Sequence, residues 1–515
     1  MRKYGNSSVW AITYLVLPIV IFFLTWLRLY IGIPCAVLLL VGAYKYYESI
    51  AGEIKGSGQW HWSKECLTAV ILIFVYLLLT GHGNFVGAVG FDVPWRNAIY
   101  HDLINEHWPV IYQNSQSALI YYLVYWLVPA GISSILHLDE FASNVVLFAW
   151  TFLGLLIFVS NLWEYLQVKS KKLLYVIYVF LFWSGLNTIG MLIMQILNSA
   201  KLVEFTFTSG WGWELWWYTG IKYSNYYMIR TVFDSLANIY NQFVPLLLGT
   251  ILFLRFKTLK NIFFVAMLTL PYSPFGFVGL GFLAVGETVG QLVLAKKNNM
   301  ENQDTVFTRQ NLLAIVTILP VFALYFFSNS MSGNTGGSIT KLATASAYNA
   351  FVLKIFVLVL YYVLQFGVFM ALCYKNNKGK PLFWLILLSL SLFPLIKLGN
   401  SSDFGWNGSI PAFFMLMVMV IQELFSFQER HRLFRKHGII LFVAVCLAAT
   451  TPILQMGFSV HKCLRHDANL VSYYHDGLDS NTLSDKDRAK IGKEFKNFAN
   501  IEYKDKAFYK YVAKD

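Results

Sequence analysis

One short stretch of the chain, residues 90–112 (GFDVPWRNAIYHDLINEHWPVIY), gathers an unusual number of side chains that can do chemistry. The whole chain is 57% hydrophobic and only 13% charged, yet this stretch carries three carboxylates, one arginine and two histidines. They are Asp92, Arg96, His101, Asp102, Glu106 and His107. A carboxylate can take a proton from a hydroxyl group, and a guanidinium can bind two phosphate oxygens at once. The stretch is therefore the first candidate for a functional site.

The spacing within this stretch predicts a short helix that begins just after Asp92. Pro94 suits the first turn of a helix, because its φ angle is already fixed near the helical value. From there Asn97, His101 and Asp102 recur at helical spacing and can share one face. The alternative interpretation is an amphipathic helix that lies on the membrane surface and has no catalytic role.

The elements that hold this stretch are expected to be membrane helices. The chain has 515 residues, a mean hydropathy of +0.54 and many apolar runs long enough to cross the hydrocarbon core of a bilayer. We therefore predict an all-α polytopic membrane protein. The first apolar run, residues 9–27, is followed by Arg28 rather than by a small-residue cleavage site, so we expect an anchor and not a cleaved signal peptide.

The net charge and the cysteine content limit which partners and which covalent or metal sites this membrane protein is expected to have. The net charge of +13 comes from Lys and Arg in short loops between apolar runs, where such residues orient a membrane protein. No nucleic-acid partner is therefore expected. The five cysteines are scattered without a C-x-x-C spacing, which predicts neither a metal centre nor a disulfide framework.

The basic loops predict the topology once one apolar run is set aside. With the N-terminus in the cytoplasm, a crossing by residues 118–137 would place the basic loop 169–172 outside, against the positive-inside rule. This run contains Pro129 and Gly131 and is flanked by polar residues, so we expect it to lie in the outer leaflet. About 13 spans remain, and the later basic loops all fall inside. These loops are residues 255–260, 296–309, 375–380 and 430–436.

Most of the unusual sequence is then expected on the outer face. A transmembrane domain, residues 1–458, carries a first outer loop at 81–143 and an aromatic outer loop at 198–238, and a small extracytoplasmic segment follows at 459–515. Trp211 belongs to the aromatic loop. Its neighbours either mark the membrane interface, where Trp and Tyr accumulate in any case, or stack on sugar rings.

Two motifs resemble a known class of proteins. The first is FDVPWRNAIYHDLI with HWPVIY, and the second is LGNSSDFGWNGSIPAFFML, which begins at residue 398. Together with the order of loops and spans, they resemble a family of bacterial polytopic membrane proteins grouped with the GT-C glycosyltransferases. The motifs depart from that family at Asn407, where an arginine is expected, and at Arg96-Asn97, where a Lys-His pair is expected.

The resemblance implies a GT-C-like bundle in the bacterial inner membrane, with the N-terminus cytoplasmic and the C-terminus extracytoplasmic. It implies an inverting transfer of a sugar from a polyprenyl-phosphate donor to a cell-envelope glycan or a lipid-linked acceptor on the outer face. The partners would be that donor, that acceptor and the lipid bilayer. No cofactor is predicted, although a divalent cation is compatible with the reaction.

Site residues follow from the motifs and from the chemistry. Asp92 is the best candidate for the base that deprotonates the acceptor hydroxyl, and His101 and Asp102 are further candidates. Arg96 is expected either to bind the donor phosphate or to form a salt bridge with Asp92. Asp403 is either a second site residue or only a helix cap. The other residues expected to contact substrate are Trp95, Asn97, Tyr112, Trp211, Ser402 and Asn407.

One intramembrane carboxylate points to a rival function. Glu287 lies in the run GLGFLAVGETVGQLVLA, roughly in the middle of a predicted span, and such a residue is a functional candidate by default. An ion-coupled transporter, or a flippase for a lipid-linked saccharide, is the alternative. Gly286 and Gly290 form a small-residue pair that would let another helix approach, and Glu287 would then only hydrogen-bond across that contact.

Overall fold

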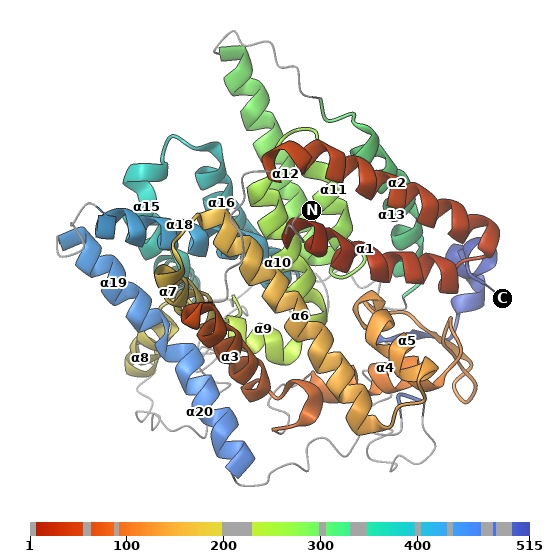
Figure 1. Cartoon of the computed structure of the whole chain (residues 1–515). Coiled ribbons are helices and arrows are strands. Elements are labelled where there is room, and N and C mark those ends of the chain that lie inside the picture. The colour runs from red at the N-terminus through yellow and green to blue at the C-terminus, as the bar shows by residue number, and fades with distance from the viewer. Residues whose placement is uncertain are drawn as a thin grey trace.

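The computed structural model describes residues 7–54, 63–86, 92–197, 229–297, 305–329, 348–396, 403–429, 436–464, 477–479 and 497–514. Most of this chain is helical, and long helices cross one another in a single bundle (Figure 1). Among these described residues, the strands form one small sheet.

The first half of the chain forms ten helices and short helical turns among its described residues, and α4 carries most of residues 90–112. They are α1 (Ser7–Trp26), α2 (Leu29–Ile54), α3 (Lys64–Leu79), η1 (His82–Asn84), α4 (Val93–Asn105), η2 (Val124–Trp126), α5 (Leu127–Ile135), α6 (Glu140–Leu166), α7 (Ser170–Leu181) and α8 (Asn187–Leu197).

The second half supplies the rest of the bundle. Its helices are α9 (Val232–Asn238), α10 (Tyr240–Arg255), α11 (Ile262–Thr269), α12 (Pro274–Lys297), α13 (Arg309–Phe327), α14 (Tyr348–Tyr362), η6 (Val363–Gly367), α15 (Val368–Asn377), α16 (Pro381–Leu392), η7 (Phe393–Leu395), α17 (Asp403–Gly408), α18 (Ile410–Glu429), α19 (Lys436–Ala448), α20 (Thr450–Leu464), η11 (Tyr503–Asp505) and η12 (Phe508–Val512).

Eight helical stretches of the described chain are long and apolar enough to cross a membrane. This agrees with the predicted class, a helical multi-pass membrane protein. The number is smaller than the predicted 13, because several apolar runs form shorter helices: α3 and α10 have 16 residues each and α11 has eight. The stretches are Ser7–Trp26, Leu29–Gly52, Glu140–Leu166, Pro274–Lys297, Arg309–Phe327, Ile355–Asn377, Asp403–Ser426 and Lys436–Leu464.

The apolar run at residues 118–137 does not form a helix of spanning length. Its residues form most of a short strand, the turn η2 and the nine-residue helix α5. A helix needs about 20 residues to cross the hydrocarbon core, so α5 covers less than half of that distance. The segment is therefore too short to cross as a single helix, and its place in the outer leaflet stays a prediction.

Close helix packing explains the glycine pair on α12. A Cβ atom on Gly286 would lie 2.3 Å from a methyl carbon of Leu385, and one on Gly290 would lie 2.9 Å from Pro381. Both neighbours belong to α16. The structure therefore confirms that these glycines let a second helix approach closely, because any larger residue would collide with it.

One end of the bundle is basic. Arg255 donates hydrogen bonds to the Ser7 hydroxyl at 3.0 Å and to Asn161 at 2.7 Å, so the beginning of α1 and the ends of α6 and α10 meet there. The Lys260 carbonyl accepts from Thr308, which brings in the beginning of α13. We call this region, residues 255–260 and their contacts, the basic end.

Glu287 lies near the middle of α12, a helix long enough to span a membrane, and its carboxylate contacts the basic end. Its Oε1 lies 3.3 Å from the ammonium group of Lys257 and accepts a hydrogen bond from Gln291 at 3.2 Å. The carboxylate is thus buried near the middle of this candidate span, as the sequence predicts, and it is paired with a cation that follows α10 in the chain.

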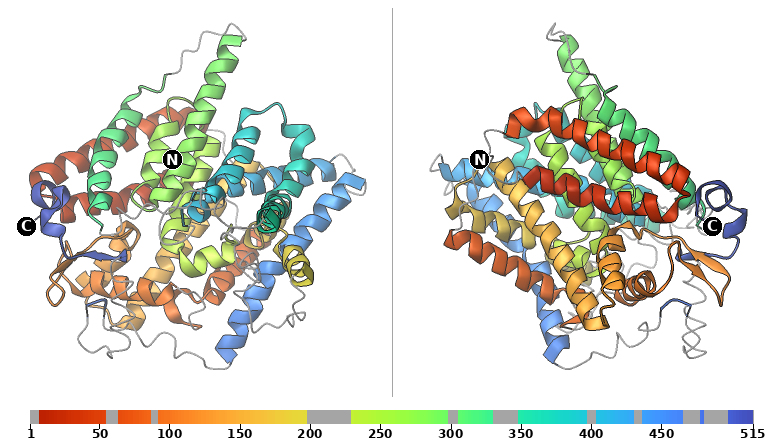
Figure 2. Two further views of the ribbon diagram at one scale, coloured as in Figure 1. Left: turned by 180° about the vertical axis from the view of Figure 1, so that it is seen from behind. Right: turned by 45° about the vertical axis from the view of Figure 1, so that its right-hand side comes forward.

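A small sheet lies at the opposite end, which we call the sheet end. Strands β1 (Ile111–Tyr112), β2 (Ser117–Leu119) and β3 (Ala499–Asn500) are antiparallel in the order β1-β2-β3 (Figure 2). Ala118 pairs with Ile111 on one side and with Asn500 on the other. The sheet is an addition to the predicted all-α fold, and it joins the first loop to the C-terminal segment.

The end of the chain is also tied to the turn between α1 and α2. The Arg28 amide donates to the Val512 carbonyl at 2.9 Å, and the Lys514 amide donates to the Trp26 carbonyl at 2.8 Å. The helix α20 continues to Leu464, six residues past the expected boundary at 458. Residues 497–514 of the C-terminal segment thus dock on the sheet end.

Candidate functional site

The helix α4 begins where the sequence predicts. Asp92 occupies the position before its first residue, and Pro94 lies in its first turn. The Asp92 carboxylate lies 3.5 Å from a terminal nitrogen of Arg96, and the two side chains are 41% and 4% exposed. The half-exposed carboxylate of Asp92 is thus in contact with the buried guanidinium of Arg96.

The Arg96 guanidinium is held from three sides. Its Nε donates to the Asn238 carbonyl at 3.0 Å, and its Nη1 donates to the Tyr121 hydroxyl. The cation also lies 5.0 Å from the centre of the Tyr121 ring. Burial works to lower the pKa of Arg96, but Tyr121 and Asp92 raise this pKa above its ordinary value. The positive charge is therefore permanent and fixed in place.

The short helix α9 carries a row of polar residues to the same place. The Asn238 side-chain oxygen accepts from the Asp92 amide at 3.2 Å, and its amide nitrogen donates to Asp234 at 2.7 Å. Asp234 in turn accepts from Arg230, whose guanidinium lies 5.1 Å from the Trp406 ring centre. Asp234 and Asn238 are four residues apart on α9 and share one face, and Arg230 lies just before the helix begins. The four-residue spacing is visible in RTVFDSLAN, but these three residues are not among those that the motifs predict.

The charge of Asp403 acts on Tyr121 and Tyr122 from another helix. Asp403 is the first residue of α17 and is partly exposed. Burial is the main cause that raises the pKa of Tyr121 and of Tyr122, and the negative charge of Asp403 adds to the rise in both. Asp92 and Arg96 thus lie beside Tyr121, and Asp403 is near enough for its charge to act on the same ring. We call this group the Asp92 cluster.

Three residues predicted to contact substrate are buried and make packing or hydrogen-bond contacts within the protein. Asn407 is 6% exposed and donates to Gln242 of α10 at 3.4 Å, so it lies in the bundle core, where helices α10 and α17 meet. Trp95 is 7% exposed and stacks on Phe498 of the C-terminal segment with ring centres 5.0 Å apart. Tyr112 is buried against Asp102. Trp211 and Ser402 lie outside the described residues.

Asp102 anchors the C-terminal segment. It is 4% exposed, and its Oδ2 accepts from the Tyr112 hydroxyl at 2.7 Å and from the Leu478 amide at 3.0 Å. His101 lies beside it, with Nδ1 3.3 Å from Oδ1. Because α4 rises 1.5 Å per residue, Asp102 is about 15 Å along the helix from Asp92. These three predicted catalytic residues therefore do not share one site.

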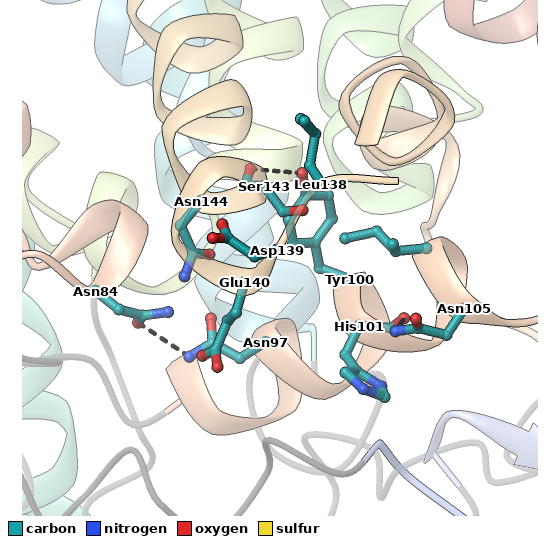
Figure 3. Close-up of a pocket in the computed structure, with 11 residues that line it drawn as sticks. Asn84, Asn97, Tyr100, His101, Asn105, Leu138, Asp139, Glu140, Ser143 and Asn144 are labelled. Atoms are coloured by element: carbon teal, nitrogen blue, oxygen red, sulfur yellow. Dashed lines mark hydrogen bonds between the residues drawn. The ribbon is translucent and has the colours of Figure 1, made fainter. Parts of the chain in front are cut away.

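A polar cavity of about 320 Å³ lies between α4 and the beginning of α6 (Figure 3). Asn97, another predicted contact, lines it and donates to Asn84 at 3.0 Å. His101 lines it as well. The cavity lies beside α4 but does not include Asp92.

The described residues contain no group of three or more His, Cys, Asp or Glu side chains placed to hold a metal ion. No protein-family model, curated protein or solved structure matches the chain. Fold and site together define a helical, multi-pass membrane protein with a buried arginine and a half-exposed carboxylate at its sheet end.

Proposed function

We propose that the protein is a membrane glycosyltransferase, which moves a sugar from a polyprenyl-phosphate donor to a cell-envelope glycan or lipid-linked acceptor. The observation that carries this proposal is the pairing of Asp92 with Arg96. One is a carboxylate with access to solvent, and the other is a buried cation that three separate contacts hold in place.

In the proposed reaction Asp92 is the general base. The acceptor hydroxyl oxygen forms a bond to the anomeric carbon of the donor sugar while the bond from that carbon to the phosphate oxygen breaks. Asp92 takes the hydroxyl proton, and the polyprenyl phosphate leaves with the bonding electron pair. A single displacement of this kind inverts the configuration at the anomeric carbon.

Arg96 is proposed to stabilise the departing phosphate. A guanidinium suits phosphate oxygens, and a cation already fixed by Asn238 and Tyr121 needs little reorganisation when charge develops. Asp403 is proposed to help orient the substrates, because its charge acts on the same tyrosines.

The distribution of charge supports an outer location for this reaction. The basic end lies away from the Asp92 cluster, with the 20-residue helix α1 running between the two ends of the bundle. Under the positive-inside rule the basic end faces the cytoplasm. We propose that the N-terminus is cytoplasmic and that the Asp92 cluster and the C-terminal segment lie outside the inner membrane of a bacterium.

The transport alternative receives less support. A coupled transporter would need an intramembrane carboxylate that binds its ion, and Glu287 is the candidate. Its pairing with Lys257 at the basic end gives it an ordinary structural function.

The test uses the purified protein in lipid nanodiscs, a panel of radiolabelled polyprenyl-phosphate sugars, and glycans or lipids extracted from bacterial envelopes as acceptors. We expect Asp92→Asn to lower the transfer rate by about 10²- to 10⁴-fold, the usual contribution of a positioned base. Glu106→Gln is the matched control, because Glu106 is an exposed carboxylate at the other end of α4, and it should leave the rate unchanged.

Two outcomes contradict the proposal. If Asp92→Asn transfers sugar at the normal rate while Asp403→Asn does not, the base is wrongly assigned. If no transfer is seen with any donor, and Glu287→Gln instead abolishes uptake of a saccharide into proteoliposomes, the protein is a transporter and not an enzyme.

A further inference from the structure

We infer that the cavity between α4 and α6 is a second binding site, which takes a small neutral saccharide. Its volume of about 320 Å³ is at the small end of the range for ligand pockets. That size suits one or two sugar rings rather than a polyprenyl chain. Binding of a sugar here does not depend on the transfer reaction proposed above.

The cavity is built from three separate parts of the chain. Asn97 and His101 come from α4, Asn84 from the turn η1, and Glu140 and Asn144 from the first turns of α6. Figure 3 shows Asn84 and Asn97 joined by a hydrogen bond on one side of the cavity, with His101 on the other. Polar side chains thus converge on one space from elements that are distant in the sequence.

The chemistry of the lining favours a neutral sugar. Each asparagine presents an acceptor oxygen and two donor hydrogens, and each carboxylate presents two acceptor oxygens. Sugar hydroxyls both donate and accept, so neighbouring hydroxyls can pair with these groups. No Lys or Arg is present among the described residues that line the cavity. A phosphate or another anion would meet Asp139 and Glu140 without a compensating cation, which disfavours it.

The lining also has the apolar part that a sugar ring requires. Tyr100, Ile104 and Leu138 contribute to the wall of the cavity. The Tyr100 hydroxyl is held by the Ser143 carbonyl at 2.8 Å and by Ser133 at 3.2 Å, so its ring is fixed before a ligand arrives. Because the ring is already ordered, ligand binding loses less side-chain conformational entropy.

Unmet hydrogen-bonding capacity points to a ligand as well. Ser143 lines the cavity and is only 2% exposed, yet its hydroxyl has no hydrogen-bond partner among the described residues. A buried hydroxyl without a partner costs free energy, and a ligand hydroxyl can supply the missing bond once the Ser143 side chain rotates toward the cavity, because its oxygen is closed to solvent in this conformation.

The cavity is distinct from the Asp92 cluster. Successive residues of an α-helix are turned by about 100°, so Asn97 and His101 face about 100° to 140° away from Arg96. Asp92 and Arg96 do not line the cavity. A saccharide held here can therefore be present whether or not the Asp92 cluster is occupied.

The experiment measures direct binding to the intact protein in nanodiscs, without a polyprenyl donor. The probes are methyl glucoside, methyl galactoside, N-acetylglucosamine and their β-linked disaccharides, followed by ligand-detected NMR. We expect saturable binding of at least one probe. Asn97→Ala and Asn144→Ala should each weaken it by about three- to tenfold, the value of one or two hydrogen bonds.

Two controls separate this site from others. Gln113→Ala removes an exposed amide at the sheet end that does not line the cavity, and it should leave binding unchanged. Asp92→Asn should also bind the probe normally, even though it should lose transfer. Loss of transfer with intact sugar binding thus tests the two proposals separately.

Three results would overturn the inference. One is the absence of saturable binding by every probe. Another is binding that Asn97→Ala and Asn144→Ala leave unchanged while both variants remain folded. The last is saturable binding of Ca²⁺ that Asp139→Asn and Glu140→Gln abolish, without any binding of sugar, since the cavity would then be a cation site.

Discussion

Replacement of Asp102 separates a structural role from a catalytic one. Its Oδ2 accepts hydrogen bonds from the Tyr112 hydroxyl and from the Leu478 amide, and all three groups are buried. Hydrogen bonds to a charged group contribute about 1.5 to 3 kcal/mol, against about 0.5 to 1.5 kcal/mol for neutral pairs. These values set the expected effect of two substitutions.

In Asp102→Asn the amide oxygen can still accept both bonds, but without the charge. The loss is about 1 kcal/mol per bond, so about 2 kcal/mol for the pair. In Asp102→Ala both bonds disappear and two buried donors stay unpaired, which costs about 3 to 6 kcal/mol. Local opening of the C-terminal segment should therefore rise by about 30-fold in the first variant and by more than about 100-fold in the second.

Hydrogen exchange of the Leu478 amide measures this opening directly. A second perturbation acts on the same contact from the other side. Gly477 has a φ of +85°, and a Cβ atom there would lie 2.1 Å from the Asp102 Oδ1. Gly477→Ala should therefore also speed exchange at Leu478, whereas Glu106→Gln, which changes an exposed carboxylate on the same helix end, should not.

Normal protection of Leu478 in Asp102→Ala would refute the anchoring role. If Asp102→Asn instead abolishes transfer while Leu478 remains protected, Asp102 acts in the chemistry, as the sequence alone first led us to expect. Loss of transfer together with loss of protection would trace the defect to the displaced C-terminal segment, whose Phe498 packs on Trp95 and Tyr121.

Two further predictions concern packing and topology. Gly286→Ala should lower the free energy of unfolding by about 1 to 3 kcal/mol in thermal denaturation, because its Cβ would meet Leu385. Adding Leu385→Ala to this variant should relieve the clash. The control is Gly281→Ala on the same helix, which has open space around it and should not lower the free energy of unfolding. Ile501 is 66% exposed, and the cysteine of Ile501→Cys should react with an impermeant thiol reagent on intact cells. The cysteine of Lys171→Cys should react only after the cells are permeabilised. The reverse pattern would invert the proposed orientation.

The sequence by itself determined the features of the structure that depend on residues close together in the chain. Pro94 starts α4 directly after Asp92, because the ring fixes the backbone of that residue whatever surrounds it. The apolar runs predict a helical membrane protein, because the backbone must satisfy its own hydrogen bonds in lipid. The spacing of Gly286 and Gly290 predicts a close helix contact for a similarly local reason, since both fall on one face of α12.

The tertiary structure alone decided which side chains meet. Leu478 lies 376 residues from Asp102, and no local pattern indicates that its amide turns a candidate base into an anchor. Arg96 likewise takes its partners from Tyr121 and Asn238, far along the chain. A side chain's neighbours depend on how whole helices pack, and burial and charge follow from those neighbours. Two aspartates only ten residues apart therefore have different surroundings: Asp92 is half-exposed and Asp102 is buried.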